Sequence, residues 1–316
     1  MAVIKTQNLH KHFGNTHAVN GIDLSVAEGE IFGLVGPDGA GKTTSIRLLT
    51  SIMEPTKGNA WVNGHPIVEG AEAVKSQIGY MSQKFGLYSD LTVLENMQFY
   101  ADIYGVSKKE QTQKIRRLLA FSKLEKFKDR LADALSGGMK QKLGLACALI
   151  HTPKVLFLDE PTNGVDPVSR REFWRILYDL HREGTTIFLA TSYMEEAERC
   201  GQVAFMYHGK IMIHGSPDDI KKHLRGTILE VRCKAPRKTL LMLREALGHD
   251  CVKLFGNRIH IYIYTESKAL SLEQVKDLLQ RSQLGEYEIR ETDPTLEDVF
   301  MSLMRDKEKE DADVRY

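Results

Sequence analysis

The stretch that most constrains the fold begins at residue 30, where the apolar run EIFGLVG leads into a glycine-rich turn and then into the helix-like pattern TTSIRLLTSIM. The turn, GPDGAGKT at residues 36–43, fits the pattern G-x(4)-G-K-[ST], which needs a strand before it and a helix after it. Glycines let backbone N–H groups converge on phosphate oxygens, and the beginning of the helix adds the positive end of its dipole. The sequence therefore predicts a strand–turn–helix unit that binds the phosphates of a nucleotide.

Two side chains of this turn have expected roles in phosphate chemistry. Lys42 is predicted to reach the β- and γ-phosphates, and the Thr43 hydroxyl to bind Mg²⁺. A second apolar strand, KVLFLDE, ends in Asp159 and Glu160. Two carboxylates at the end of a buried strand are costly unless a cation lies nearby. We expect Asp159 to hold the water shell of the metal and Glu160 to orient the water that attacks the phosphate.

Changes of pattern along the chain predict its domains. Apolar strands alternate with helical sequence up to about residue 224, which is typical of a mostly parallel sheet, and residues 90–150 indicate an inserted helical subdomain. Later the order becomes β-α-β-β-α-β, as in ferredoxin-like folds. We therefore expect an α/β nucleotide-binding domain at 1–224 and a small α+β ferredoxin-like domain at 225–304. The charged tail at 305–316 lacks apolar periodicity, so we expect it to be disordered.

The overall composition excludes some classes of function. The formal net charge is +1, which gives no electrostatic reason to expect nucleic acid as a partner. No apolar run approaches the length needed to span a bilayer, and the N-terminus is too polar for a secretory signal. The four cysteines show no CxxC pairing, which favours a reduced, cytosolic protein. A role at a membrane would therefore require a separate membrane partner.

The segment LSGGMKQ at residues 135–141 narrows the class of nucleotide-binding protein. With GPDGAGKT, VLFLDEP and a glutamine between them, it resembles the ATP-binding cassette (ABC) ATPases, whose signature is LSGGQ, over roughly residues 2–224. The resemblance implies the ABC-type P-loop fold, with a mostly parallel core sheet, an antiparallel β subdomain and the inserted helical subdomain. It also implies ATP and Mg²⁺ as cofactors. In that family the signature of one protomer, here Ser136, Gly137 and Gly138, closes over ATP on the P-loop of the other.

The resemblance also assigns roles position by position. The Walker A loop that surrounds the nucleotide would comprise Gly36, Pro37, Asp38, Gly39, Ala40, Gly41, Lys42, Thr43 and Thr44. Phe13 would stack on adenine through the face of its ring. Gln83 would meet Mg²⁺ or the attacking water, and Asp166 would lie at the dimer interface. With Glu160 and Lys42, Gln83 and the residue at position 192 would complete the catalytic group.

Three positions depart from the family pattern. Asp38 stands where the family usually has Asn, which adds a negative charge beside a polyphosphate. Met139 replaces the signature Gln, and we expect this change to be mild. Ser192, in the run TSYMEEA, stands where the family has a His that holds the γ-phosphate and positions water. Serine can donate one hydrogen bond but cannot carry a positive charge, and loss of one such donor typically costs about 10²–10³ in rate.

Three segments resemble the ATPases of ABC-2 type exporters in particular, namely LSGGMKQKLGLACAL, TNGVDPVSRREFW and PTLEDVF. This resemblance implies a transport-coupled ATPase that works with a separate membrane-spanning permease. It would act as a homodimer, or as a heterodimer with another ABC ATPase, in the cytoplasm on the inner face of the cell membrane. Phe85 and Tyr88 are candidate contacts for the permease, which would choose the transported substrate.

Two alternatives stay open. Ser192 favours a subunit that binds ATP but is impaired in its hydrolysis, acting as a regulatory or asymmetric partner. The other alternative is a soluble ABC protein of the translation-factor or DNA-repair kind. Such proteins carry two cassettes in one chain or a long coiled-coil insertion, and this sequence shows neither.

Overall fold

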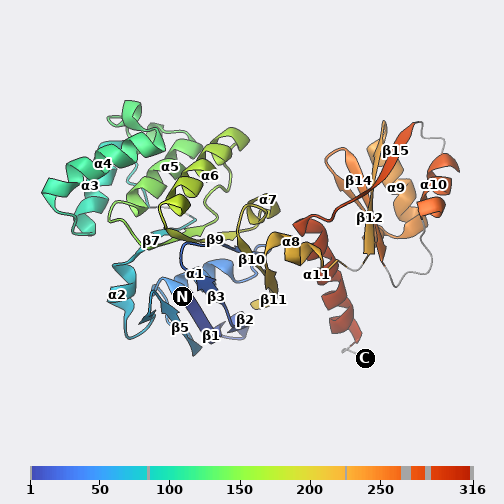
Figure 1. Ribbon diagram of the computed structural model, residues 1–316, viewed down its shortest axis with the longest axis horizontal. Helices are drawn as coiled ribbons and strands as arrows, with labels where there is room; N and C mark the ends of the chain where they lie inside the picture. The colour runs from blue at the N-terminus through green and yellow to red at the C-terminus, as the bar shows by residue number, and fades with distance from the viewer. Residues whose placement is uncertain (1, 84–85, 225, 265–271, 282–285, 314–316) are drawn as a thin grey trace. The chain divides into compact units, whose positions relative to one another are not determined.

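A computed structural model of the chain describes residues 2–83, 86–224, 226–264, 272–281 and 286–313. The chain divides into two compact units, Met1–Pro217 and Asp218–Tyr316 (Figure 1). Each unit has a hydrophobic core of its own. The candidate permease contact Phe85 lies outside the described residues. Among the residues that are described, no helix combines the length and the apolar character needed to cross a lipid bilayer.

A mostly parallel sheet forms the centre of the first unit. Its strands lie in the order β11-β10-β4-β9-β8-β7, with the bounds Lys210–Gly215, Gln202–Tyr207, Ile31–Val35, Thr186–Thr191, Val155–Asp159 and Ile78–Met81. Strand β11 is antiparallel to β10, and the other neighbouring pairs are parallel. The register pairs Val35 with Thr191 and Asp159 with Ala190. The carboxyl ends of β4, β8 and β9 therefore meet at one edge of the sheet, where ligands of α/β proteins bind.

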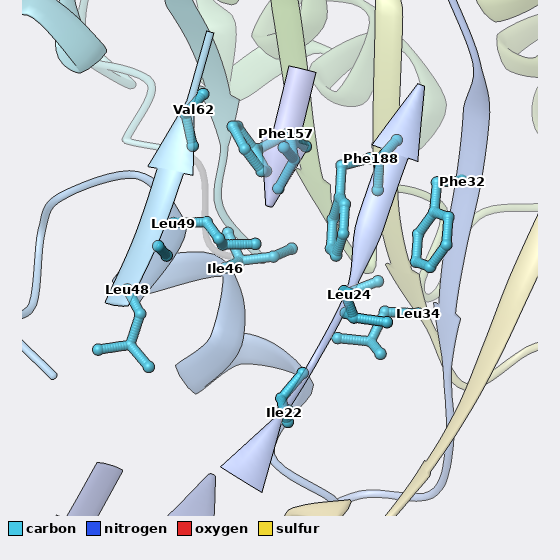
Figure 2. Close-up of a cluster of buried hydrophobic side chains, with 14 of the residues drawn as sticks. Ile22, Leu24, Phe32, Leu34, Ile46, Leu48, Leu49, Val62, Phe157 and Phe188 are labelled. Atoms are coloured by element: carbon cyan, nitrogen blue, oxygen red, sulfur yellow. The ribbon is translucent and has the colours of Figure 1, made fainter. Parts of the chain in front are cut away.

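An antiparallel sheet forms a second layer of the first unit. Its order is β2-β1-β5-β6, with β3 paired to β1, and the bounds are Thr16–Ile22, Ala2–Phe13, Lys57–Val62, His65–Pro66 and, for β3, Ser25–Ala27. Helix α1 (Lys42–Leu49) belongs to the hydrophobic cluster that joins this sheet to the parallel one. Figure 2 shows Ile46 and Leu49 of α1 beside Phe157 of β8 and Val62 of β5. Each such fully buried side chain stabilises the fold by about 1.5–3 kcal/mol, so the core holds α1 against both sheets.

A helical subdomain separates β7 from β8, as the sequence predicts. It contains the elements α3, α4, η1, η2 and α5, with the bounds Val93–Ile103, Lys108–Ser122, Glu125–Phe127, Ala132–Ala134 and Gly137–Ala148 (Figure 1, green). Thr92 and Glu95 form a capping box at the beginning of α3, which satisfies backbone N–H groups that the helix leaves free. The apolar faces of these helices pack into a separate hydrophobic cluster.

Three further helices belong to the first unit, and a fourth begins at its end. Helix α2 (Ala71–Lys75) precedes β7, and α6 (Pro167–Arg182) links β8 to β9. Asp166 caps α6, and Pro167 occupies the first turn, where its missing N–H costs nothing. Helix α7 (Met194–Ala197) follows β9, and α8 (Pro217–Lys221) spans the division between the two units.

The second unit has the element order that the sequence predicts for a ferredoxin-like domain. The elements β12, α9, η3, β13, β14, α10 and β15 have the bounds Gly226–Cys233, Pro236–Leu247, His249–Cys251, Val252–Phe255, Arg258–Tyr264, Leu272–Arg281 and Tyr287–Thr292. The sheet order is β13-β14-β12-β15, and every neighbouring pair is antiparallel. The two central strands are thus the first and third of the domain, as the split arrangement requires.

The expectation of a disordered tail from residue 305 is wrong for most of that segment. Helix α11 begins at Leu296 and continues to Asp313. The helix thus continues past its last large apolar residues, Leu303 and Met304. Residues 314–316 lie outside the described part of the chain.

Candidate functional site

The glycine-rich turn joins β4 to α1 at the carboxyl edge of the parallel sheet. Gly41 caps α1 with a left-handed backbone, φ 111°, which a residue with a side chain rarely adopts. A Cβ atom on Gly36 would lie 2.1 Å from the carbonyl oxygen of Met206. These two positions therefore require glycine, because one needs an unusual backbone and the other a close approach to β10.

Lys42 is buried at the beginning of α1, with 5% of its surface exposed. Its Nζ donates hydrogen bonds to the carbonyl oxygens of Gly36 (2.8 Å) and Pro37 (3.0 Å). The same Nζ lies 3.2 Å from Oε1 of Glu160, which is 6% exposed. A buried ammonium needs a negative partner, and Glu160 fills that role in this structure. A polyphosphate in the turn would compete with Glu160 for the same cation.

Asp159 and Thr43 lie together beside the turn. The Thr43 hydroxyl donates to Oδ1 of Asp159 over 3.0 Å. Asp159 is 1% exposed, and its Oδ2 has no hydrogen-bond partner among the described residues. Burial raises the pKa of the Asp159 carboxyl, with a smaller contribution in the same direction from the charge of Glu160. An orphaned buried carboxylate oxygen beside a hydroxyl is a donor set that suits Mg²⁺, so these residues fit the predicted metal.

Glu160 has a strained backbone. Its φ is 48°, in the left-handed region that costs a residue with a side chain about 1–3 kcal/mol. Two contacts hold it there: its N–H donates to the carbonyl oxygen of Ala190 in β9 (2.8 Å), and its Oε2 accepts from Nδ2 of Asn163 (3.1 Å). Strain of this kind clusters at functional sites, where the surrounding structure holds a side chain in place.

A cavity of about 590 Å³ opens over the turn and is lined by eight of the predicted site residues. The predicted residues that line it are Asp38, Gly39, Gly41, Lys42, Thr43, Thr44, Gln83 and Glu160. Four lining residues were not predicted, namely Thr16, His17, Ala18 and His208. No motif marks them, because they arrive from β2 and from the turn between β10 and β11. The N–H of Gly209 donates to the carbonyl oxygen of Ala40 (2.9 Å), which fixes that turn beside the P-loop.

Several predicted residues do not line this cavity. Phe13, at the end of β1, is 49% exposed, and the Nζ of Lys11 lies 5.4 Å from its ring centre. Asp166 accepts from the backbone N–H groups of Val168 and Ser169, both over 3.0 Å. The Ser169 side chain, and then these backbone N–H groups, lower the pKa of the Asp166 carboxyl. Asp166 thus has a structural role as a helix cap in the isolated chain.

The signature also lies outside the cavity lining. Ser136 caps α5 by accepting from the N–H of Met139 (3.4 Å). A Cβ atom on Gly138 would lie 2.5 Å from the side chain of Ser169, so any other residue there would require α5 or α6 to shift. Gly137 has open space around the corresponding position. The chain therefore does not complete its own nucleotide cavity with its own signature.

Ser192 follows the last residue of β9 and is half-buried. Within the described ranges its hydroxyl makes no hydrogen bond, and Ser192 does not line the cavity. The residues on either side of Ser192, in contrast, form hydrogen bonds. Thr191 donates to Glu196 (2.5 Å), and the N–H of Tyr193 donates to Oγ1 of Thr191 (3.0 Å).

Glu196 is a buried carboxylate that sequence reasoning did not single out. It is 1% exposed and accepts hydrogen bonds from Oγ1 of Thr162 (2.5 Å), Oγ1 of Thr191 (2.5 Å) and Nε1 of Trp174 (3.3 Å). These donors belong to the loop after β8, the end of β9 and helix α6. Glu196 therefore ties together the segments that carry Glu160 and Ser192. Its context, MEEAE, resembles an exposed acidic helix and hides this role.

Two sequence comparisons agree with this geometry. The family model described as "ABC transporter" matches residues 19–163. The "Probable multidrug ABC transporter ATP-binding protein YbhF" of Escherichia coli (strain K12) is 40% identical over 310 residues, 96% of this chain and 52% of that protein. The "Nod factor export ATP-binding protein I" of Rhizobium sp. (strain N33) is 37% identical over 97% of this chain and 98% of that protein. The chain thus spans about half of the E. coli relative and nearly all of the Rhizobium one.

A solved structure extends the likeness to three dimensions. The protein cbiO1 from Clostridium perfringens, described as part of the ABC transporter complex cbiONQ, superposes with a TM-score of 0.65 at 28% identity. The match covers 78% of this chain and 98% of that one. The predicted ABC-type fold is thereby confirmed, and the chain belongs to the family of ATP-binding proteins of ABC transporters.

Proposed function

We infer that this chain is the ATP-hydrolysing subunit of an ABC-2 type exporter and that it drives a separate membrane-spanning permease. The inference rests on two contacts beside one cavity, at the carboxyl ends of β4 and β8. Lys42 forms an ion pair with Glu160, and Thr43 forms a hydrogen bond with Asp159. The names of the E. coli and Rhizobium relatives, a multidrug transporter protein and a Nod factor export protein, support the exporter assignment.

The contact between Lys42 and Glu160 would change when ATP binds, and this change favours hydrolysis. A triphosphate in the cavity brings negative charge to Lys42 and draws its ammonium away from Glu160, which is 3.2 Å distant here. The carboxylate of Glu160 is then free to accept a hydrogen bond from a water molecule and orient it for attack. Thr43 and Asp159, with Gln83 in the same lining, would hold Mg²⁺, which when bound neutralises charge on the phosphate oxygens.

The partners follow from what the single chain lacks. Because Ser136, Gly137 and Gly138 do not line the chain's own cavity, we propose that they close over the nucleotide of a second ATPase subunit, either another copy or a related protein. Asp166 would lie at that interface. Tyr88 is 44% exposed, and we propose that it faces the permease on the cytoplasmic side of the membrane.

Two alternatives receive less support. A hydrolysis-impaired subunit rests on Ser192 alone, and the comparisons lend it no support. A soluble ABC protein of translation or DNA repair disagrees with the transporter names of the relatives. Replacing Ser192 with His tests the first alternative: a rise in turnover above about 100-fold would mean that the natural chain is impaired.

The deciding experiment measures ATP turnover of the purified chain with and without Mg²⁺. We expect Mg²⁺-dependent turnover in the wild type and a loss of at least about 100-fold in Glu160→Gln, with binding of a fluorescent ATP analogue retained. Glu28→Gln, which alters an exposed carboxylate in the same unit, is the matched control. Absence of turnover in the wild type, or equal turnover in Glu160→Gln, would contradict the proposed function.

A further inference from the structure

We propose that Asn163 and Tyr193 form a positioning relay that holds the carboxylate of Glu160 in the orientation needed to direct the attacking water. The proposal rests on the ATPase function proposed above and deepens it. The relay connects the loop after β8 with the residue that follows Ser192. Asn163 and Tyr193 act on the attacking water only through Glu160 and do not contact the reacting atoms themselves.

The hydrogen bonds of the relay have a defined direction. Nδ2 of Asn163 donates to Oε2 of Glu160 over 3.1 Å, and the hydroxyl of Tyr193 donates to Oδ1 of Asn163 over 3.2 Å. An ionised carboxylate can only accept, so the amide of Asn163 must present its NH₂ group to Glu160. The amide oxygen is then left for the Tyr193 hydroxyl, which fixes the amide against rotation.

Tyr193 is itself held on two sides. Its N–H donates to Oγ1 of Thr191 (3.0 Å), and Thr191 donates in turn to the buried Glu196. The guanidinium carbon of Arg170 lies 4.4 Å from the centre of the Tyr193 ring. In the described part of the chain the buried Nε of Arg170 has no hydrogen-bond partner. The guanidinium thus lies between the Tyr193 ring, in a cation–π contact, and the carboxylate of Glu195, which is 3.8 Å from its Nη1.

The relay becomes important when nucleotide enters. In the structure Glu160 has one contact on each carboxylate oxygen, Lys42 on Oε1 and Asn163 on Oε2. A triphosphate attracts Lys42 and so removes its contact with Glu160. The hydrogen bond from Asn163 then holds the Glu160 side chain alone. A carboxylate fixed through Oε2 presents Oε1 to water, whereas a free glutamate side chain samples several rotamers. Misplacing a catalytic group by about 1 Å can cost about 100-fold in rate.

Tyr193 directly follows Ser192, the position at which the family has a histidine. Ser192 has no hydrogen bond of its own within the described ranges, so the end of β9 does not reach the site through that side chain. The next residue, Tyr193, does reach Glu160, through Asn163. The relay thus gives the end of β9 a contact with the catalytic carboxylate that does not depend on residue 192.

The test uses Tyr193→Phe, which keeps the ring over Arg170 and removes only the hydroxyl. We expect kcat to fall about tenfold, with KM and the dissociation constant of a fluorescent ATP analogue changed less than about twofold. Asn163→Ala should lower kcat further, and the two changes together should cost no more than Asn163→Ala alone. Tyr178→Phe in α6 is the matched control, because the Tyr178 ring contacts Trp174 but takes no part in the relay.

Epistasis with Glu160 separates positioning from a general structural role. In a Glu160→Gln background, Tyr193→Phe should leave the residual turnover unchanged, because the residue that the relay positions is already disabled. Wild-type turnover that is abolished by Glu160→Gln but unchanged in Tyr193→Phe would overturn the relay alone. A further loss caused by Tyr193→Phe in the Glu160→Gln background would also overturn it. Absence of turnover in the wild type would overturn both proposals at once.

Discussion

Removal of the Glu196 carboxylate is expected to destabilise the first unit far more than its sequence context suggests. The side chain is 1% exposed, and it accepts hydrogen bonds from Thr162, Thr191 and Trp174. In Glu196→Ala these donors lose their acceptor inside the protein. The two hydroxyls can rotate toward other acceptors, but the indole N–H of Trp174 is fixed by its ring.

The expected loss in free energy of unfolding is the sum of the costs of the donors left without an acceptor. An unsatisfied buried donor costs about 1–3 kcal/mol, so we take about 1 for each hydroxyl and about 2 for the indole, or about 4 kcal/mol together. A loss of about 4 kcal/mol lowers the Tm of a unit the size of Met1–Pro217 by about 8–16 °C.

Thermal unfolding followed by tryptophan fluorescence is the suitable assay. The chain has two tryptophans, Trp61 and Trp174, so a Trp61→Phe background isolates the residue that contacts Glu196. Glu196→Gln, which keeps one acceptor oxygen, should lose only about 1 kcal/mol. Glu28→Ala, at an exposed position, is the matched control. A Tm for Glu196→Ala within about 2 °C of that control, or above it, would refute the hydrogen-bond argument.

Two further predictions concern the packing of the helical subdomain. His151 stacks on Tyr104 with ring centres 3.8 Å apart and donates from Nε2 to the carbonyl oxygen of Ile78 (2.9 Å), while its buried Nδ1 has no partner among the described residues. Burial lowers the pKa of His151 in the folded chain below its ordinary value of 6.5. At a pH between the folded and the ordinary pKa, the imidazole is protonated in the unfolded chain but not in the folded one. The free energy of unfolding therefore falls as the pH drops below 6.5. His151→Gln should therefore show a smaller decrease in Tm from pH about 7.5 to about 5.5 than the wild type, and an identical decrease would contradict this. Gly138→Ala should cost about 1–3 kcal/mol in urea unfolding, because its Cβ would lie 2.5 Å from Ser169, and Ser169→Gly should restore most of the loss; no restoration would exclude this clash as the cause.

Much of the fold was predictable because its signals are local. The P-loop needs a strand, a glycine turn and a helix within about twenty residues, and each is specified by its own short pattern. The strand order of the second unit follows from the sequence order of its elements, since the split arrangement has one common topology. The helix over 305–313 could not be predicted from apolar periodicity, because this charged segment has none.

The sequence by itself determined the kind of site: a phosphate turn, two carboxylates at a strand end, and a serine where the family has an imidazole. Only the tertiary structure decided how Glu160 is held, because Asn163 and Tyr193 are 30 residues apart and meet through the parallel pairing of β8 with β9. The same pairing buries Glu196, which the acidic run MEEAE does not reveal. Local patterns specify which groups are present, whereas hydrogen bonds between distant segments exist only once the sheet has brought those segments together.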